Sequence, residues 1–485
     1  KLFDVFDDSR PGFFERYNFT ITEDTPLDQE VAVNPEMIGK VYESLVNISN
    51  DVDLRQKGGV FYTARTEIDL MSRLSLVDWL ANHLGSHFKK ELYRFIFAFT
   101  DEEKTEADLS ITEKNLWSQI RKLLEGITVL DPACGSGSFL VGMLMVIDDL
   151  LKRTYKHLGI TMTSYQRRKN IIGNSLYGVD VKKWAVQVAE LRLWLQLVVE
   201  TEIDPLADPD VPLLPNLTFK IRPGDSLIQE LGGIILSLND IKRDIISPAT
   251  KKEIALLKKK KLEYFYGNSK LDEKLLLEKE RLVFKNMLSE QIKLITEQNK
   301  RLRSTAQNGQ DQISFSETRD GAREKKMKEI ERHISENKER IKHLEDGLAQ
   351  LGDDPPFVWD LSFVEIFESD KDGFDLVIGN PPYVRQEDIA DPTGRILDKK
   401  VYKSKIQRAV AVAWPNFFKY CRNPEKFEKP SGRSDLYVYF YFLGLSLLNE
   451  KGSFCFITSN SWLDVEFGKD LQEFLLKHGH VKMII

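Results

Sequence analysis

The chain is 485 residues long, more than one compact core usually holds, and this length predicts about two or three domains. Hydrophobic residues make up 42% of it and charged residues 30%, as in a globular protein that works in water. No apolar run approaches the length of a membrane span, and no signal peptide is visible. The net charge of −6 disfavours a nucleic-acid partner only mildly, because a local basic surface matters more than the total.

The cysteines exclude two further classes of site. Cys134, Cys421 and Cys455 are far apart in the sequence and form no CxxC pair. Disulfides and zinc sites are therefore not expected, and we expect a cytoplasmic protein with no bound metal. The chain begins at Lys1 rather than Met and ends on an apolar run, which favours a piece of a longer protein.

Residues 1–125 are predicted to form a helical segment. Asn34 caps one helix and Pro35 opens it, and a second helix follows Thr66. Between the two, the stretch from Gly58 to Thr63 reads GGVFYT. Two glycines followed by aromatics and a hydroxyl could lay backbone against a small ligand, although taken alone the stretch favours a plain helix connector.

A glycine-rich turn follows the first predicted strand. The stretch from Thr128 to Ser138 reads TVLDPACGSGS and leads into a helical run from Phe139 to Leu151. The glycines let the backbone approach a ligand at the helix N-terminus, and Asp131 supplies a carboxylate beside it. It is not a phosphate loop, because no Lys-Ser or Lys-Thr follows the glycines. For Cys134, packing in a tight turn is favoured over a role as a nucleophile.

A second and a third strand extend this pattern over residues 126–240. The second runs from Leu176 to Asp180, and an acidic residue closing it is the usual partner of a glycine-rich first turn, accepting hydrogen bonds from ribose hydroxyls. The third is predicted from Leu217 to Ile221 and ends at the sequence GDSL. There Asp225 either lines the same pocket or is a turn residue. We interpret these units as the first half of an α/β core.

Residues 241–352 follow a different pattern. Apolar residues keep heptad spacing on both sides of a polar stretch, 304–317, which predicts an antiparallel helical hairpin inserted between strands three and four. The lysines of this segment, such as Lys258 to Lys261, could touch phosphates. Charge runs on long helices are more often solvated faces, and we favour that interpretation.

The fourth predicted strand ends in a rigid turn. The stretch from Phe374 to Tyr383 reads FDLVIGNPPY, and its apolar, β-branched half is typical of a strand buried on both faces. Two prolines cannot continue a ladder, so Asn380 and the Pro381 carbonyl are expected at the carboxyl end of the strand, where open α/β sheets bind ligands. The alternative is an ordinary strand stop with an Asn-Pro turn.

This turn suits chemistry on an amino group. The exocyclic nitrogen of adenine shares its lone pair with the ring and is a poor nucleophile until acceptors hold both of its hydrogens. The Asn380 side-chain oxygen and the Pro381 carbonyl can act as those acceptors. Tyr383 would stack on the face of a planar base, which is worth roughly 1–3 kcal/mol.

The last predicted elements complete the second half of the core, residues 353–485. A helix begins at Ser434-Asp435, a fifth strand covers Gly452 to Thr458, a further helix covers Phe467 to His478, and a sixth strand covers Val481 to Ile485. The summed pattern is a doubly wound α/β sheet of Rossmann type.

The ordered set GGVFYT, DPACGSGSF, YGVD, GDSL and IGNPPYV resembles the amino-group (N6-adenine) DNA methyltransferases. The helical front segment and the long lead-in are similar to the large type II restriction-modification and phage-defence enzymes. The resemblance implies S-adenosylmethionine as cofactor and double-stranded DNA as substrate. The catalytic residues it implies are Asn380, Pro381, Pro382 and Tyr383. The cofactor-binding residues it implies are Phe61, Tyr62, Thr63, Asp131, Ala133, Gly135, Gly137, Asp180 and Asp225.

The chain also departs from that family. A further base-stacking aromatic and a target-recognition domain usually follow the sixth strand; the chain stops before either, and we expect the target-recognition domain beyond residue 485. Matches to a nuclease motif, such as Asp272-Glu273-Lys274, lie in charged helix and are expected by chance, so a nuclease is expected only as a domain or subunit outside this chain. Cytosine-carbon methylation is disfavoured because it needs a Pro-Cys dipeptide, which does not occur.

Other functions remain as alternatives. The same NPPY logic can serve an RNA base or a protein glutamine amide, but such enzymes are typically shorter, so the length favours DNA. A scaffold that only binds the cofactor is the other alternative, and the intact Asn380 argues against it.

Overall fold

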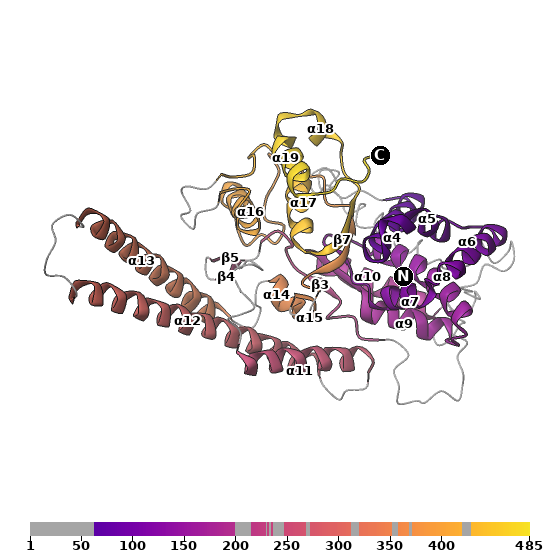
Figure 1. The fold of residues 1–485 in the computed structure, drawn as a ribbon, viewed down its shortest axis with the longest axis horizontal. Coiled ribbons are helices and arrows are strands. Elements are labelled where there is room, and N and C mark those ends of the chain that lie inside the picture. The colour runs from indigo at the N-terminus through magenta and orange to yellow at the C-terminus, as the bar shows by residue number, and fades with distance from the viewer. Residues whose placement is uncertain are drawn as a thin grey trace, which may run out of the picture.

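The computed structural model describes residues 63–198, 215–228, 230–231, 234–235, 247–267, 272–311, 320–351, 357–367, 371–419 and 428–485 (Figure 1). The helix expected after Asn34 and the first part of the GGVFYT stretch lie outside them, as does Cys421. Among the described helices, none is long and apolar enough to cross a membrane.

A parallel sheet of five strands forms the centre of the molecule, in the order β3-β2-β1-β6-β7. Its strands are β1 (Val129–Asp131), β2 (Leu176–Asp180), β3 (Ile221–Pro223), β6 (Phe374–Gly379) and β7 (Leu448–Phe456). A separate antiparallel pair is formed by β4 (Glu230–Leu231) and β5 (Ile234–Ile235). The expected Rossmann-like fold is confirmed.

Strand β6 contributes side chains to two different cores on opposite sides of the sheet, with an irregularity between Phe374 and Leu376 that interrupts the alternation. Leu376 and Ile378 of β6 belong to one core, whereas Phe374 and Val377 belong to the other. Every residue of β6 is buried, as its apolar, β-branched sequence predicts for a strand covered on both faces. The sheet is therefore doubly wound.

Two strand predictions are wrong. The third strand begins at Ile221 rather than Leu217, because the Leu217 carbonyl accepts hydrogen bonds from the amides of Lys220 (2.7 Å) and Ile221 (3.0 Å) and closes a local turn. The stretch from Val481 to Ile485 is apolar but forms no strand in the described structure. It lies on the surface without a ladder partner, and Ile485 is 93% exposed.

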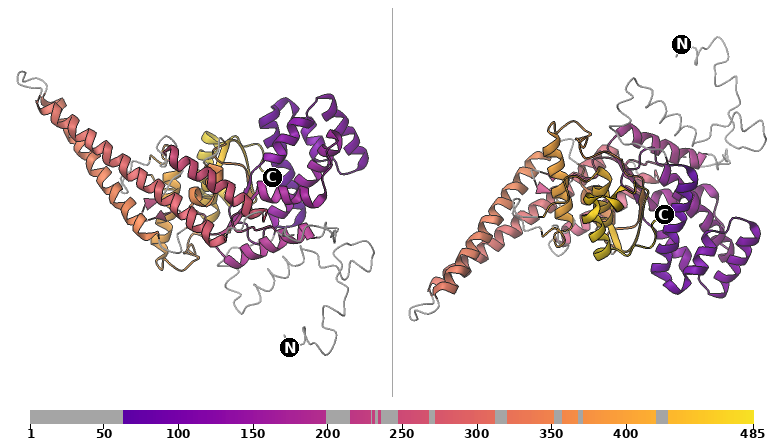
Figure 2. Two further views of the ribbon diagram at one scale, coloured as in Figure 1. Left: turned by 90° about the horizontal axis from the view of Figure 1, so that it is seen from below. Right: turned by 90° about the horizontal axis from the view of Figure 1, so that it is seen from above.

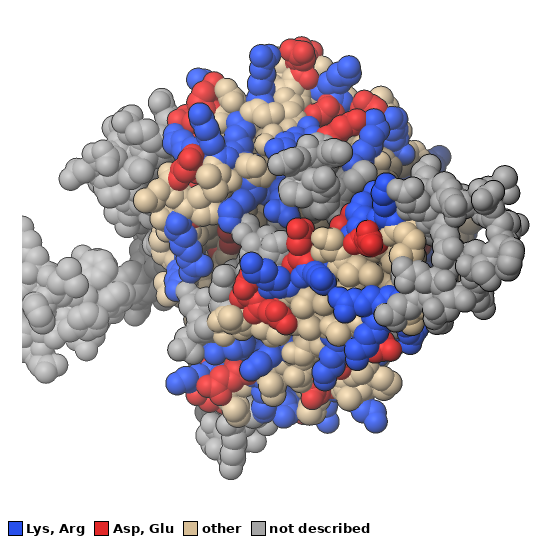
Figure 3. All heavy atoms as spheres, turned by 90° about the vertical axis from the view of Figure 1, so that its left-hand side faces the viewer, with Lys and Arg blue, Asp and Glu red and all other residues tan. Residues whose placement is uncertain are grey.

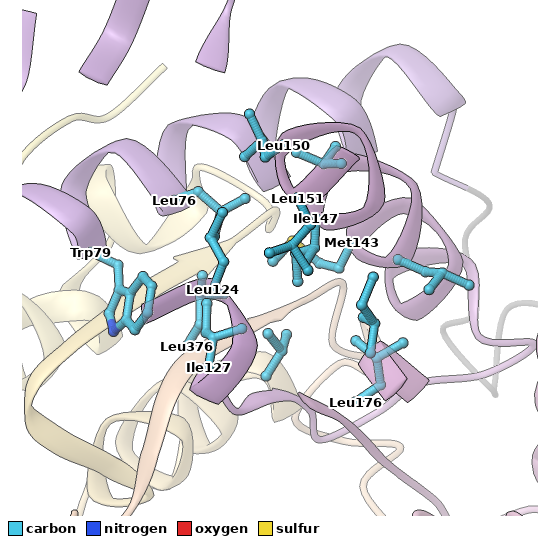
Figure 4. Close-up of a cluster of buried hydrophobic side chains, with 14 of the residues drawn as sticks. Leu76, Trp79, Leu124, Ile127, Met143, Ile147, Leu150, Leu151, Leu176 and Leu376 are labelled. Carbon is cyan, nitrogen blue, oxygen red and sulfur yellow. The ribbon is translucent and has the colours of Figure 1, made fainter. Parts of the chain in front are cut away.

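The helices of the front segment share a core with the sheet. They are α4 (Arg65–Leu84), η3 (Ser86–Phe88), α5 (Lys89–Ile96), α6 (Asp101–Glu113) and α7 (Trp117–Gly126). Thr100 and Glu103 form a capping box at the start of α6. Leu76 of α4 packs in the same cluster as Ile147 of α8 (Ser138–Leu158) and Leu376 of β6 (Figure 4). These helices are therefore part of the body that positions the strand ends.

The remaining helices of the body cover both faces of the sheet (Figure 1). They are α8 (Ser138–Leu158), α9 (Ser164–Ser175), α10 (Lys183–Val198), α14 (Trp359–Ser362), α15 (Val364–Phe367), α16 (Lys399–Ala413), α17 (Leu436–Ser446), α18 (Ser461–Asp464), η5 (Glu466–Gly468) and α19 (Lys469–His478). The helices expected after Asp435 and near Phe467 are thus present.

The inserted segment contains three long helices rather than two: α11 (Pro248–Phe265), α12 (Glu273–Asp311) and α13 (Asp320–Gln350). Two of them, α12 and α13, lie side by side and project away from the sheet (Figures 1 and 2). Leu288 and Ile295 pack against Leu344, and the Asn337 amide donates to the Asn299 side-chain oxygen at 2.8 Å. Leu257 of α11 packs against α12 in a separate small cluster.

Buried ion pairs join the insertion to the body. Lys261 Nζ lies 3.0 Å from a Glu280 oxygen and 3.2 Å from a Glu365 oxygen, and Arg222 donates both of its terminal nitrogens to Glu280. Lys261 is only 5% exposed. The expected solvated lysine face is therefore wrong for this residue, because its ammonium group is enclosed by carboxylates of α12 and α15.

Candidate active site

The NPPY turn stands at the carboxyl end of β6, next to β1. The Gly379 carbonyl accepts the last ladder bond, from the Ile457 amide at 3.1 Å, and the prolines that follow Asn380 end the strand. Asn380 Nδ2 donates to the hydroxyl of Thr63 at 2.9 Å. Because this bond fixes the amide nitrogen on Thr63, the amide oxygen occupies the opposite side of the group.

Thr63 is a buried residue that contacts the NPPY turn. The resemblance implied cofactor binding for the Phe61–Thr63 stretch, and Phe61 and Tyr62 lie outside the described residues. Thr63 itself is 7% exposed and holds the side chain of Asn380, which follows it by 317 residues. The front segment therefore orients the NPPY turn directly.

Tyr383 is held at both ends of its side chain. Its hydroxyl donates to the Ile457 carbonyl at 3.0 Å, and its ring centroid lies 6.0 Å from that of Tyr437. Burial raises the pKa of Tyr383 to about 12, with Tyr441 and Tyr437 adding to the effect. The side chain is therefore a neutral phenol at physiological pH, and its ring is the part available for stacking.

The glycine-rich turn after β1 requires glycine at two positions. Gly135 and Gly137 have φ angles of 51° and 80°, which L side chains rarely adopt. A Cβ atom on Gly137 would lie 2.8 Å from the Cβ of Ala189, so α10 packs directly on the turn. A Cβ atom on Gly135 would meet no heavy atom within 4 Å. The turn thus presents open space at Gly135.

The other residues of this turn are structural. Cys134 is 5% exposed, and burial raises the pKa of its thiol well above the ordinary value, which agrees with packing rather than nucleophilic attack. Arg192 of α10 donates to the carbonyl and hydroxyl of Ser136 at 3.0 Å and to the hydroxyl of Ser138 at 2.9 Å. Arg192 could not be recognised from the sequence, because α10 also contains Lys183 and Glu190 and nothing sets Arg192 apart from them.

Asp180 and Asp131 flank the turn. Asp180 accepts hydrogen bonds from the amides of Gly135 at 3.0 Å and Lys182 at 2.8 Å. Asp131 accepts from the amide of Ala133 at 3.1 Å and is 1% exposed. A Cβ atom on Gly379 would lie 2.7 Å from its carboxylate, so the ends of β1 and β6 meet here.

Asp225 closes the row of acids after β3. Its carboxylate accepts from the amide of Leu227 at 2.9 Å and from the hydroxyl of Tyr402, on α16, at 2.8 Å. Ser226 beside it donates to the Pro132 carbonyl at 2.6 Å, which ties this loop to the glycine-rich turn. Asp225 therefore lies at the same edge as the other two acids rather than in an isolated turn.

The three carboxyl groups share one electrostatic property. Burial raises the pKa of Asp131 to about 8, opposed by the Ala133 amide and reinforced by the charge of Asp180. Burial also raises the pKa of Asp180 and of Asp225 above the ordinary value. A ligand that carries positive charge or hydrogen-bond donors would stabilise their ionised forms. The described residues include no group of three or more side chains that could hold a metal ion.

The structure thus brings together the eleven sequence-predicted site residues that it describes. They lie at the carboxyl ends of β1, β2, β3 and β6 or in contact with them: Thr63, Asp131, Ala133, Gly135, Gly137, Asp180, Asp225, Asn380, Pro381, Pro382 and Tyr383. The site falls where β1 lies between β2 and β6, the switch point at which open sheets bind ligands.

The chain is similar in sequence to known DNA methyltransferases. Residues 174–485 match the Eco57I restriction-modification methylase family, and residues 105–216 match the MmeI DNA-methyltransferase domain. A putative type II restriction enzyme and methyltransferase of Methanocaldococcus jannaschii is 31% identical over 392 residues, which are 77% of this chain and 32% of that protein.

Two further relatives match shorter stretches. A type II methyltransferase of Geobacillus stearothermophilus is 33% identical over 23% of this chain and 15% of its own length. DNA methyltransferase A of Bacillus subtilis is 24% identical over 34% of this chain and 16% of its own length. The chain therefore spans at most about a third of these relatives. With the family match covering well over half of its residues, the chain belongs to the Eco57I family of restriction-modification methylases.

Proposed function

We propose that the protein transfers a methyl group from S-adenosylmethionine to the exocyclic amino group of adenine in double-stranded DNA, as part of a restriction-modification system. Membership of the Eco57I family supports a DNA methyltransferase. The observation that carries the choice of an amino group is the side chain of Asn380, held by Thr63 at the carboxyl end of β6.

The NPPY turn provides acceptors for the two hydrogens of the amino group. With its nitrogen held on Thr63, the Asn380 side chain can use its oxygen to accept one hydrogen, and the Pro381 carbonyl can accept the other. These bonds free the nitrogen lone pair for attack. The base must leave the DNA stack to reach the turn, and the anchored ring of Tyr383 offers a surface for it to stack on.

The residues after β1, β2 and β3 fit the cofactor. Open space at Gly135 admits a ligand close to the backbone, and the acids suit its positive sulfonium and its hydroxyl and amino donors. In this proposal Asp180 accepts from ribose hydroxyls and Asp225 lies near the adenine ring. When bound, S-adenosylmethionine supplies a methyl group whose bond to sulfur breaks as the bond to the adenine nitrogen forms, and the nitrogen then loses a proton.

The test is modified-base sequencing of DNA from cells that express the complete gene, with purified protein assayed in parallel. We expect methylated adenines within one short recurring sequence. Asn380→Ala should lower the rate of methyl transfer roughly 100- to 1,000-fold, because it removes one of the two acceptors aimed at the amino group. Asn337→Ala, which removes a similar amide on the projecting helices, is the matched control and should leave the methylation pattern unchanged.

Two outcomes would contradict the proposal. Methylation that survives Asn380→Ala would show that the NPPY turn is not the reaction centre. Unmodified DNA from cells with folded protein, together with methylated RNA or protein glutamine, would move the activity to another substrate.

A nuclease outside this chain remains part of the proposal. The Methanocaldococcus jannaschii relative is named as both restriction enzyme and methyltransferase, and this chain covers 32% of it. The complete protein, with any subunit that copurifies, should cut unmethylated plasmid that carries the recognition sequence and spare plasmid methylated beforehand. Equal cutting of both plasmids, or of neither, would argue against this pairing.

A further inference from the structure

Helix α16 connects two parts of the site that are distant in the sequence. Tyr402, in its first turns, is 2% exposed and donates its hydroxyl to Asp225 at 2.8 Å. The two residues are 177 positions apart. Asp398 caps the start of the helix by accepting from the Lys400 amide at 2.7 Å. A capped helix therefore places the Tyr402 hydroxyl against the acid that follows β3.

The same turns of α16 also hold the segment that follows the NPPY turn. Lys403 donates to the backbone carbonyl of Gln386 at 3.0 Å and to its side-chain oxygen at 3.1 Å. Lys399 donates to the Glu387 carbonyl at 3.3 Å. Gln386 also donates its backbone amide to Asp435 at 3.0 Å. The first turns of α16 thus contact both Asp225, through Tyr402, and the segment after Tyr383, through Lys399 and Lys403.

The orientation of the Asp225 carboxylate depends on this helix. The Leu227 amide binds one carboxylate oxygen and Tyr402 binds the other, so two separate segments fix the plane of the group. An ionised carboxylate has about four acceptor positions, so each oxygen can accept a further bond from a ligand. A donor that binds there strengthens the ionised form and, with it, the bond from Tyr402.

We propose that Tyr402 is a positioning residue that aligns Asp225 for an amino donor of the cofactor's adenine ring and, through α16, links cofactor binding to DNA binding. The proposal rests on the proposed function. A cofactor that stabilises the position of α16 also stabilises residues 386–387 beside the NPPY turn and so increases the affinity for DNA bound there. By thermodynamic linkage, bound DNA increases the affinity for the cofactor by the same factor.

The experiment uses isothermal titration of the complete protein with S-adenosylhomocysteine and with S-inosylhomocysteine, which lacks the amino group. The wild-type protein should prefer the adenosyl compound. Tyr402→Phe should weaken S-adenosylhomocysteine binding about tenfold and reduce that preference, since it removes only the hydroxyl that orients Asp225. Tyr439→Phe is the matched control: its ring is fully buried and its hydroxyl donates at 3.1 Å to the Ser431 carbonyl instead.

A second measurement tests the link to DNA. Affinity for a duplex that carries the recognition sequence is measured with and without S-adenosylhomocysteine. We expect the ligand to increase DNA affinity several-fold in the wild-type protein and in Tyr439→Phe, and to have little effect in Tyr402→Phe.

The outcomes separate this inference from the proposed function. If the wild-type protein binds S-adenosylhomocysteine and Tyr402→Phe binds it equally well, the role of Tyr402 is overturned and the proposed function is not. The same holds if Tyr439→Phe weakens binding as much as Tyr402→Phe does. Failure of the folded wild-type protein to bind S-adenosylhomocysteine overturns both.

Discussion

The two ends of strand β6 use buried polar groups in opposite ways. At the amino end, Asp375 is 1% exposed and accepts hydrogen bonds from the amide and hydroxyl of Thr128, from Lys371 and from Asn449. At the carboxyl end, Asn380 is oriented by Thr63, and the acids beside it have raised pKa values. The donors around Asp375 come from the protein itself, whereas the acids at the other end suit donors from a ligand.

The burial of an acid therefore does not by itself identify a functional site. Asp375 and Asp131 are equally buried, at 1% exposure each, and lie on adjacent strands. They differ in what surrounds the carboxylate: a lysine and two polar side chains at one end, and a backbone amide and a second acid at the other. The amino end should therefore govern stability and the carboxyl end chemistry.

The largest expected effect tests the amino end. Asp375→Ala should lower the free energy of unfolding by about 3–5 kcal/mol, because it removes the carboxylate that accepts hydrogen bonds from the buried Thr128 amide and from the Asn449 side chain. Chemical denaturation monitored by circular dichroism measures the loss. A change below about 1 kcal/mol would mean that Asp375 does not hold the strands together.

A pair of isosteric substitutions compares the two ends directly. Thr63→Val should lower kcat about 10- to 100-fold with little change in stability, because Asn380 loses the acceptor that orients it. Thr128→Val should instead lower the free energy of unfolding by about 1–3 kcal/mol and leave kcat unchanged, because its hydroxyl serves Asp375. Steady-state methylation assays and denaturation curves on both variants give the answer, and equal kinetic losses would contradict the comparison.

The pH dependence of stability provides the third test. The pKa of Asp131 is raised to about 8 in the folded protein, from 3.8. Between these two pH values the Asp131 carboxyl is protonated in the folded state and ionised in the unfolded state. Its contribution to the free energy of unfolding is therefore complete below about pH 4 and is lost as the pH rises towards 8. In this range the free energy of unfolding falls by up to about 1.4 kcal/mol for each unit of pH.

Asp131→Asn isolates this contribution from those of the other acids. The difference between the wild-type and variant stability curves from pH 5 to pH 8 should decrease as the pH rises. Parallel curves would show that Asp131 keeps an ordinary pKa in the folded protein.

The smallest stability effects compare two glycines with similar backbones. Gly135 and Gly159 have φ angles of 51° and 67°, and a Cβ atom on either would meet no heavy atom within 4 Å. Substitution by Ala should therefore cost each about 1–2 kcal/mol of stability through backbone strain. Only Gly135→Ala should also weaken binding of S-adenosylhomocysteine, because Gly159 caps the far end of α8. Calorimetric titration of both variants distinguishes them.

Local pattern was enough for the parts of the fold that depend on neighbouring residues. The strands that end at Asp131, Asp180 and Gly379 were predicted from apolar runs followed by turn residues. The prediction was wrong for two apolar runs whose backbone does not pair with a neighbouring strand. Leu217 closes a turn, and the run that ends at Ile485 has no neighbouring strand.

The site followed the same division. The acids and the NPPY turn could be recognised because each ends or closely follows a strand, and parallel strands place their carboxyl ends at one edge. The partners of these residues could not be recognised. Thr63 binds Asn380, Tyr402 binds Asp225 and Arg192 binds the glycine-rich turn, and each contact joins segments more than fifty residues apart.

The sequence by itself determined the strand ends, the glycine-rich turn and the NPPY turn, because backbone geometry and the alternation of side chains are local properties. Only the tertiary structure decided that burial raises the pKa of Asp131 and that Asn449 donates to Asp375, since distant segments supply both the burial and the donor. It also decided that Lys261 is a buried partner of two carboxylates rather than part of a solvated helix face. On the face of the molecule shown in Figure 3, Lys and Arg are interspersed with Asp and Glu.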